Sequence, residues 1–263
     1  MAFFPLSSVI NTKGFCTVHN FPPNQWELGL NSKKSLWAIY SDGSNWQTQQ
    51  LDDFELGESK TYYFNELSQL TKSGNSSLIL LQFRKTPLEK KIKVLPEHEF
   101  KYTKLPEWRS TVGFKLGKAQ TSYQGEINPF PPSATLLTFH PFIQLNEVKN
   151  YLLFFNIENS PLPRSAELEI FDSGSKKLID KVKIQNNTTN VIPLNKYDFN
   201  SNELPVFLCR DMAGIPFGFG ISKNEMMLSL EHTHPPASFV VHGERFKVQR
   251  EIKKKWFSIL KKT

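Results

Sequence analysis

The sequence predicts an all-β protein built from two tandem β-sandwich domains of the immunoglobulin-like kind, followed by a basic amphipathic helix. Three observations support this. Short runs rich in aromatic and β-branched residues recur along the chain, and 22 phenylalanines are among its 263 residues. Gly, Asn, Asp, Ser and Pro separate these runs, and 17 prolines are spread over the whole length. Six sequence landmarks also recur in the same order in the two halves, which indicates an internal duplication.

The predicted strands lie before residue 244. "AELEIFD" (166–172) and "DKVKI" (180–184) alternate between apolar and polar residues, as half-buried strands do. The other runs are "KSLWAIYSD" (34–42), "SSLILLQFR" (76–84), "NYLLFFNIEN" (150–159), "LPVFLCRD" (204–211) and "FVVHG" (239–243). In this part of the chain we expect helix only as a turn in "DFELGES" or "FNELSQL".

The proposed duplication depends on paired landmarks. The pairs are "TVHNF" (17–21) with "TFHPF" (138–142), "LWAIYS" (36–41) with "LLFFNI" (152–157), "FNEL" (64–67) with "LNKY" (194–197), "LLQFR" (80–84) with "VFLCR" (206–210), "GFKLGK" (113–118) with "GFGISK" (218–223), and "GEINPFPP" (125–132) with "LEHTHPP" (230–236). The spacing requires an insertion in the first copy, chiefly residues 85–108. The alternative is that sandwich strands resemble one another by composition alone.

The Pro-rich stretch "NPFPPSA" (128–134) marks the predicted domain boundary. We therefore expect an N-terminal sandwich over residues 1–130, a C-terminal sandwich over 131–243 and the helix over 244–263. At about 110 residues, each sandwich is large enough to bury a core of its own.

Charge is concentrated at the C-terminal end. Residues 244–263 carry eight Lys/Arg and two Glu, whereas the other 243 residues carry 24 basic and 23 acidic side chains. No run approaches the roughly 18 apolar residues of a membrane span, and the N-terminus does not read as a secretory signal. Cys16 and Cys209 form no motif and are expected to be free thiols. The sequence thus predicts a cytoplasmic protein, with peripheral contact at the inner membrane face left open.

Three of the six histidines lie within "MMLSLEHTHPPASFVVHGERF" (226–246). In a strand, His232 and His234 share one face, and a returning "SFVVHG" would bring His242 towards them. This spacing can present imidazoles to a divalent ion such as zinc, iron or manganese, with His242, Glu244 or His140 as third ligand.

Two readings without metal stay open for the same stretch: a polar cluster at a strand end or interface, and ligand binding. Glu231 points to the opposite strand face, so it is a poor metal ligand and a candidate for ligand or partner binding. The matching corner of the first copy keeps the prolines but has no histidine. His19 and His140, by contrast, recur in paired landmarks and are expected to be structural.

Two further residues are candidates for ligand or partner binding. Trp46 lies in a polar loop, where an indole either stacks on a sugar ring or partner residue or folds back on its own domain. Arg210 adjoins Asp211 at the end of a predicted strand, and an ion pair there is the simpler reading.

The segment 244–263 is predicted to form a helix with two faces. Val248, Ile252, Trp256, Ile259 and Leu260 fall within one arc, and cations occupy the other side. Such a helix lies on an anionic membrane, docks on a partner, or packs on its own sandwich. The residues assigned to a membrane or partner contact are Lys247, Arg250, Lys254, Lys255, Trp256, Phe257 and Lys261.

These patterns favour a non-enzymatic binding or assembly protein. Its two sandwiches would engage a protein or glycan, and the basic helix would fix its position; nucleic acid is a poor fit because the body has no basic face. The alternative is a metal-dependent enzyme acting on a carbohydrate or other small polar substrate at His232, His234 and His242.

Overall fold

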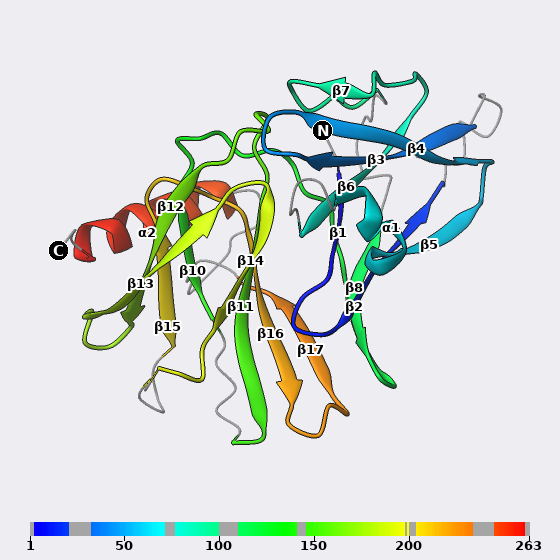
Figure 1. Cartoon of the computed structure of the whole chain (residues 1–263). Helices are drawn as coiled ribbons and strands as arrows, with labels where there is room; N and C mark the ends of the chain where they lie inside the picture. Colours follow the sequence, from blue (N-terminus) through cyan, green and yellow to red (C-terminus); the bar gives the residue numbers. More distant parts are fainter. Residues whose placement is uncertain are drawn as a thin grey trace. The chain divides into compact units, whose positions relative to one another are not determined.

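The computed structural model describes residues 3–20, 33–71, 77–99, 110–140, 146–197, 199, 204–233 and 245–260 (Figure 1). In these ranges the chain consists mainly of antiparallel strands, with two helices. The mostly-β class predicted from the sequence is therefore confirmed. None of the helices described is long and apolar enough to cross a membrane.

The chain divides into two compact units. Unit 1 comprises Met1–Phe130, Asn156–Arg164 and Asn186–Thr189, and unit 2 comprises Pro131–Phe155, Ser165–Gln185 and Asn190–Thr263. Two short segments inside the predicted C-terminal domain thus group with unit 1.

Unit 1 holds two sheets, in the strand orders β1-β6-β3-β4-β7 and β5-β2-β8-β9. Its elements are β1 (Phe4–Ser7), β2 (Lys13–His19), β3 (Lys34–Ser41), β4 (Trp46–Phe54), β5 (Ser59–Tyr63), α1 (Phe64–Thr71), β6 (Leu78–Arg84), β7 (Lys91–Ile92), β8 (Thr111–Leu116) and β9 (Ala119–Gln124). Alternate side chains of both sheets, such as Leu36 and Leu81 from one and Cys16 and Val18 from the other, meet in one buried cluster. The helical turn expected in "FNELSQL" is α1.

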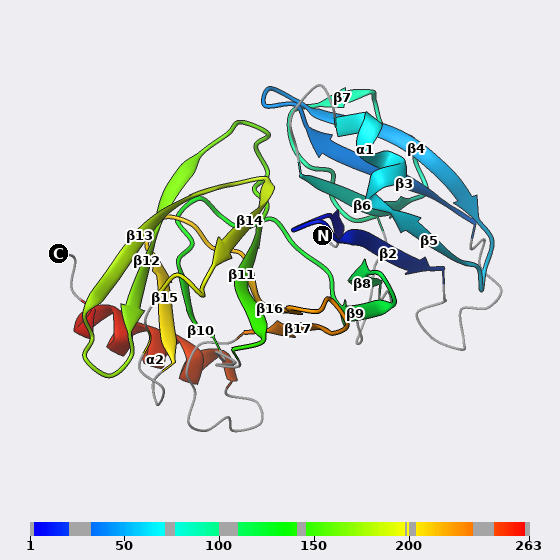
Figure 2. The same cartoon turned by 60° about the horizontal axis from the view of Figure 1, so that its bottom comes forward.

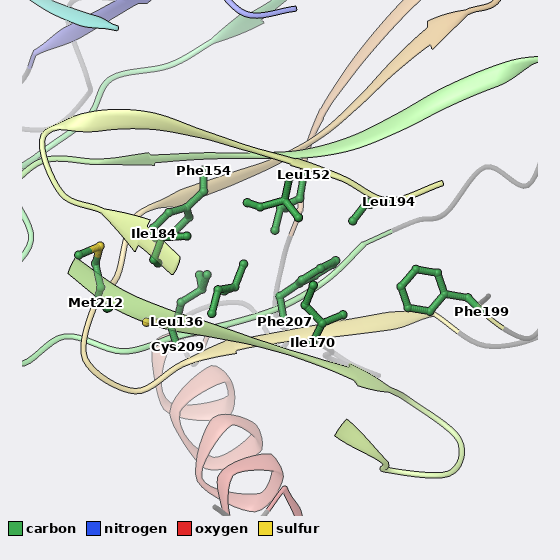
Figure 3. Close-up of a cluster of buried hydrophobic side chains, with 13 residues drawn as sticks. Leu136, Leu152, Phe154, Ile170, Ile184, Leu194, Phe199, Phe207, Cys209 and Met212 are labelled. Carbon is green, nitrogen blue, oxygen red and sulfur yellow. The ribbon is translucent and has the colours of Figure 1, made fainter. Parts of the chain in front are cut away.

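Unit 2 also holds two sheets, in the orders β10-β15-β12-β13 and β14-β11-β16-β17. Its elements are β10 (Leu136–Phe139), β11 (Val148–Asn156), β12 (Ser165–Asp172), β13 (Leu178–Gln185), β14 (Thr188–Pro193), β15 (Pro205–Cys209), β16 (Ile215–Ser222), β17 (Leu228–His232) and α2 (Arg245–Ile259). Figure 3 shows Leu152 and Phe154 of one sheet pointing at Ile170 and Phe207 of the other, and all four are buried. Removal of this apolar surface from water is the main force that holds the two sheets together.

The two units have the same strand order. When β7 is set aside, β1-β6-β3-β4 corresponds to β10-β15-β12-β13, and β5-β2-β8-β9 corresponds to β14-β11-β16-β17. The extra strand β7 lies in the segment 85–108 that the sequence marks as an insertion. The first strand of each unit pairs with the sixth strand in this series. This differs from the immunoglobulin order, in which the first strand lies beside the second.

This strand order corrects two of the landmark pairs. "TVHNF" begins in β2 but "TFHPF" begins in β10, the counterpart of β1. "LWAIYS" lies in β3 but "LLFFNI" begins in β11, the counterpart of β2. His19 and His140 therefore do not occupy equivalent positions. The pairs on β6 and β15, and on β8 and β16, do correspond.

The turns after β3 and β12 are closed by the same device. The Asp42 carboxylate accepts hydrogen bonds from the backbone N–H groups of Ser44 and Asn45, at 2.8 and 2.7 Å. The Asp172 carboxylate accepts from Gly174 and Ser175, at 3.1 and 2.7 Å. An aspartate at this position fixes a turn by replacing backbone acceptors with its own oxygen atoms.

Each unit also covers the outer face of its first sheet. In unit 1, residues 95–97, after β7, lie on that face, where Gln82 donates to the Pro96 carbonyl oxygen at 3.4 Å and Leu95 is buried. In unit 2, the cover is α2, which runs across β10, β12 and β15 (Figure 2). The predicted C-terminal helix is thus present, and it packs on its own unit.

Candidate functional site

The C-terminal helix α2 and the sheet beneath it bring together most of the predicted site residues that the structure describes. Trp256, Phe257 and Leu260 project from the helix onto the sheet, and Leu260 is only 1% exposed. The sheet residues that receive them are Leu137, Phe139, Phe171, Leu178, Val206 and Leu208. Aromatic and aliphatic side chains of this size account for most of the free energy gained by burial.

Ring contacts fix the orientation of Trp256 and Phe257. The Trp256 ring meets Phe139 edge to face, with ring centroids 5.0 Å apart. The Lys176 ammonium lies 4.3 Å from the Trp256 ring centroid, and the Arg210 guanidinium lies 5.3 Å from that of Phe257. Both rings are half-buried in these contacts. Much of their apolar surface is thus used inside unit 2, and their part in a membrane or partner contact stays a prediction.

Arg210 joins the end of α2 to the sheet. Its Nη2 donates to the Leu260 carbonyl oxygen at 2.6 Å, and its Nε donates to Glu169 Oε2 at 3.2 Å. A cation bonded to the last carbonyl groups of a helix satisfies acceptors that lack intrahelical partners. Arg210 thus forms an ion pair with Glu169, which is 5% exposed; the pair expected with its neighbour Asp211 stays a prediction.

Lys253 provides a second link between α2 and the sheet. Its Nζ donates to the Thr135 carbonyl oxygen, just before β10. Burial lowers the pKa of this lysine below its ordinary value, because the charged form loses solvation. Sequence reasoning missed Lys253, Glu169 and Lys176. Only Glu169 could have been found from the sequence, because the alternation in "AELEIFD" places it on the strand face that points away from the core.

The opposite side of α2 is exposed and mainly cationic. Arg250, Lys254 and Lys255 are exposed there, together with Glu251. We call Arg250, Lys254 and Lys255 the basic face. Lys177, in the turn after β12, is also exposed. Lys261 lies outside the described residues, and the backbone of Lys247 belongs to the first turns of α2.

The structure describes only part of the histidine stretch. His232 is half-buried on β17, and its ring centroid lies 5.5 Å from that of Phe217. Glu231 is exposed and pairs in register with Gly218, on the other face of the strand, as the strand period requires. His234, His242 and Glu244 lie outside the described residues. Among the residues that are described, there is no group of three His, Cys, Asp or Glu that could hold a metal ion.

A small pocket lies near His140. The ring Nε2 of this residue is 3.2 Å from the Tyr151 carbonyl oxygen, and a side chain at Gly218 would meet Nε2 at 2.9 Å. The pocket has a volume of about 10 Å³ and is lined by His140, Asn150, Gly218, Phe219, Gly220, Ser229 and Glu231. This space holds about one water molecule, so it is too small for a sugar or a peptide.

Trp46 is part of the interior of unit 1. Its side chain is 1% exposed, and Nε1 donates to the Asn159 carbonyl oxygen at 2.8 Å. A buried indole needs such an acceptor for its N–H group. No ring face of Trp46 is open to a sugar or a partner, so the packing alternative is the one observed.

Other buried ionisable groups take part in structural contacts. Arg84 pairs with Glu99 at 2.7 Å, and Arg164 pairs with the buried Glu158. Cys16 is buried, and the loss of solvation raises the pKa of its thiol to about 12, so it is not a nucleophile at neutral pH.

Comparisons with known proteins give no assignment: no protein-family model, curated protein or solved structure matches this chain.

Proposed function

We propose that this protein is a non-enzymatic binding or assembly protein. In this proposal, two β-sandwiches arose by tandem duplication, and the basic face of α2 on the second of them holds an anionic partner. The observation that carries the proposal is the orientation of α2, with its aromatic residues on the sheet and its cations in solvent.

The duplication is supported by the strand order that both units share once β7 is set aside. Three local features support it further. Asp42 and Asp172 close the turns after β3 and β12 in the same way. The turns before β5 and β14 each contain a residue of positive φ, Gly57 at 85° and Asn187 at 54°. Arg84 ends β6, and Arg210 directly follows β15.

Charge supports an anionic partner. The segment 244–263 carries eight of the chain's 32 Lys and Arg residues, although it is a small part of the chain. Because α2 is fixed at both Arg210 and Lys253, its cations are held on one side of unit 2. Cations fixed on one side of a molecule raise the association rate and affinity for an anionic surface.

The use of the buried ionisable groups supports a non-enzymatic role. Catalysis depends on acids, bases or nucleophiles directed into a site that a substrate can enter. Glu99, Glu158 and Glu169 are instead paired with arginines within the fold. Trp46 was the residue that suggested a glycan partner, and its burial leaves no ring face for a sugar. We therefore restrict the proposed partner to an anionic one.

The test is binding to a soluble polyanion, fluorescein-labelled polyglutamate, followed by anisotropy. The variant Arg250→Glu/Lys254→Glu/Lys255→Glu reverses the basic face. The matched control Lys90→Glu/Lys91→Glu/Lys118→Glu changes the net charge equally, at exposed lysines of unit 1. We expect the first variant to lose binding and the control to retain it. Equal loss in the two variants would refute a localised site, since net charge alone would explain the binding.

A further inference from the structure

We infer that the partner of the basic face is an anionic phospholipid bilayer, bound at its headgroups without insertion of α2. This inference rests on the proposed function and names the chemistry of its partner. It starts from the two unlike sides of α2, the docked side with Trp256 and Phe257 and the exposed side with the basic face.

The exposed side of α2 does not resemble a protein-binding surface. Tight protein interfaces are centred on aromatic or aliphatic anchors that fill a pocket in the partner. Here the aromatic residues of α2 are packed on its own sheet, and Ile259, at 41% exposure, is the one large apolar side chain that the described part of α2 presents to solvent. Charge is therefore the main source of affinity. A site that binds through charge alone suits a surface with many equivalent anionic groups, and the headgroups of an anionic bilayer form such a surface.

The cations are spread over the solvent-facing half of α2. Arg250 and Lys254 are four residues apart and lie close together, whereas Lys255 lies about 100° further round the helix, with Glu251 between Lys254 and Lys255. The three positions span about 7.5 Å along the helix axis. The Lys176 ammonium lies over the Trp256 ring, on the docked side of α2, and is not counted in the basic face.

Two alternatives fit less well. An inserted amphipathic helix needs a free apolar face, and that face of α2 is occupied by residues such as Leu137 and Leu208. Nucleic acid binding requires a longer row of phosphate contacts. Outside residues 244–263, the chain has 24 basic and 23 acidic side chains, so it does not extend the basic face.

The expected effect follows from the number of cations. Each Lys or Arg near an anionic membrane raises the partition coefficient by about fivefold at moderate salt. Neutralising three of them should lower it by about 100-fold, and charge reversal should lower it further. Because the contact is exposed and electrostatic, binding should also decrease steeply as salt is raised from about 50 to about 500 mM.

The experiment is co-sedimentation of the full chain with vesicles of phosphatidylcholine, with and without phosphatidylserine. We expect binding only when phosphatidylserine is present. Arg250→Gln/Lys254→Gln/Lys255→Gln should lower the partition coefficient by about 100-fold, and Lys90→Gln/Lys91→Gln/Lys118→Gln should leave it unchanged. Circular dichroism and thermal melting of each variant establish that it is folded; these exposed side chains are not part of the core.

Two further measurements separate the alternatives. The first uses lipids that are brominated in the acyl chain and quench nearby tryptophan. The Trp256 emission, obtained by subtracting the spectrum of Trp256→Phe, should not be quenched, because the indole stays on its sheet. Strong quenching would overturn headgroup binding.

The second compares polyglutamate and a DNA duplex with the vesicles at equal salt. If the basic face binds either probe but not the vesicles, the inference fails and the proposed function stands. If it binds none of the three, both fail.

Discussion

Arg84 ends β6 and Arg210 directly follows β15, two strands with the same place in the strand order of their sheets, and each arginine bonds to a segment that covers its sheet. Arg84 ends β6, and its Nη1 donates to the Glu97 carbonyl oxygen at 3.1 Å while Nη2 pairs with Glu99 at 2.7 Å. Arg210 follows β15 and donates to the Leu260 carbonyl oxygen at 2.6 Å. The two covering segments differ, because one is a loop and the other is a helix. In both units, therefore, an arginine at the end of a strand holds the covering segment in place.

Arg210→Gln is expected to destabilise unit 2 and loosen α2. The substitution removes the bond to Leu260 and the charge partner of the Glu169 carboxylate, which is 5% exposed; among the described residues Lys181 stays 4.0 Å from it. Breaking a buried ion pair from one side costs about 3–5 kcal/mol, and we expect about 2–3 kcal/mol here because the Arg210 side chain is 19% exposed. Urea unfolding measures the loss, and limited proteolysis at α2 reports the loosening. The double variant with Glu169→Gln should recover part of the stability; no recovery would contradict the assigned role of the pair.

Deletion of residues 245–263 is expected to yield an aggregating protein. From charge alone, the rest of the chain should be a nearly neutral folded body. The structure changes this expectation, because α2 covers Leu137, Phe171, Val206 and Leu208. An exposed apolar face of this kind binds dyes and promotes association. Light scattering and binding of anilinonaphthalene sulfonate measure both effects. A monomeric truncated protein with unchanged thermal stability would show that the helix contributes little to unit 2.

The composition and periodicity of the sequence were enough to predict the mostly-β class and the presence of the C-terminal helix. Runs such as "AELEIFD" and the arc from Val248 to Leu260 depend on local patterns, which a sequence displays directly. Strand pairing depends on contacts between distant residues. The pair "TVHNF" and "TFHPF" therefore looked equivalent by letter, although the first begins in β2 and the second in β10. Pairs such as "LLQFR" and "VFLCR" do fall on corresponding strands.

The candidate site was harder to predict than the fold. The helical pattern gave the two faces of α2 but not which of them meets protein, since an apolar arc fits a sheet, a membrane or a partner equally well. Trp46 was misleading because a polar stretch such as "SDGSNWQ" gives no sign of an acceptor 113 residues away, the Asn159 carbonyl oxygen. Arg210 was found by its position, but its partners Glu169 and Leu260 are set by tertiary structure.

Tyr62→Phe and Tyr197→Phe are expected to alter the acid limb of the stability profile. The Tyr197 hydroxyl donates to Asp180 Oδ2 at 2.6 Å, and the Tyr62 hydroxyl donates to Asp52. These bonds are the main reason that the pKa of each aspartate lies below its ordinary value. An aspartate with a lowered pKa in the folded state stabilises the fold above its ordinary pKa, near 3.9, and loses this contribution as the pH falls through the folded value.

Each tyrosine variant should therefore melt below the wild type at pH 5, and the difference should shrink as the pH falls below about 3. Calorimetry across this pH range makes the measurement, with Tyr63→Phe, on the same strand as Tyr62, as the control. A difference that stays constant with pH would show that the tyrosines contribute by packing rather than through the aspartates.

Metal analysis decides between the binding protein and the alternative metal-dependent enzyme at His232, His234 and His242. We expect no stoichiometric zinc, iron or manganese in protein purified without chelators. The metal content of the variant His232→Ala/His234→Ala should be the same as that of the wild type. The reason lies in the one histidine of this set that the structure describes. The His232 ring lies against Phe217, and the carboxylate of Glu231 is on the other strand face, so Glu231 is poorly placed to join His232 in binding one metal ion. One equivalent of metal that is lost in the double variant would instead favour the enzyme and overturn the non-enzymatic proposal.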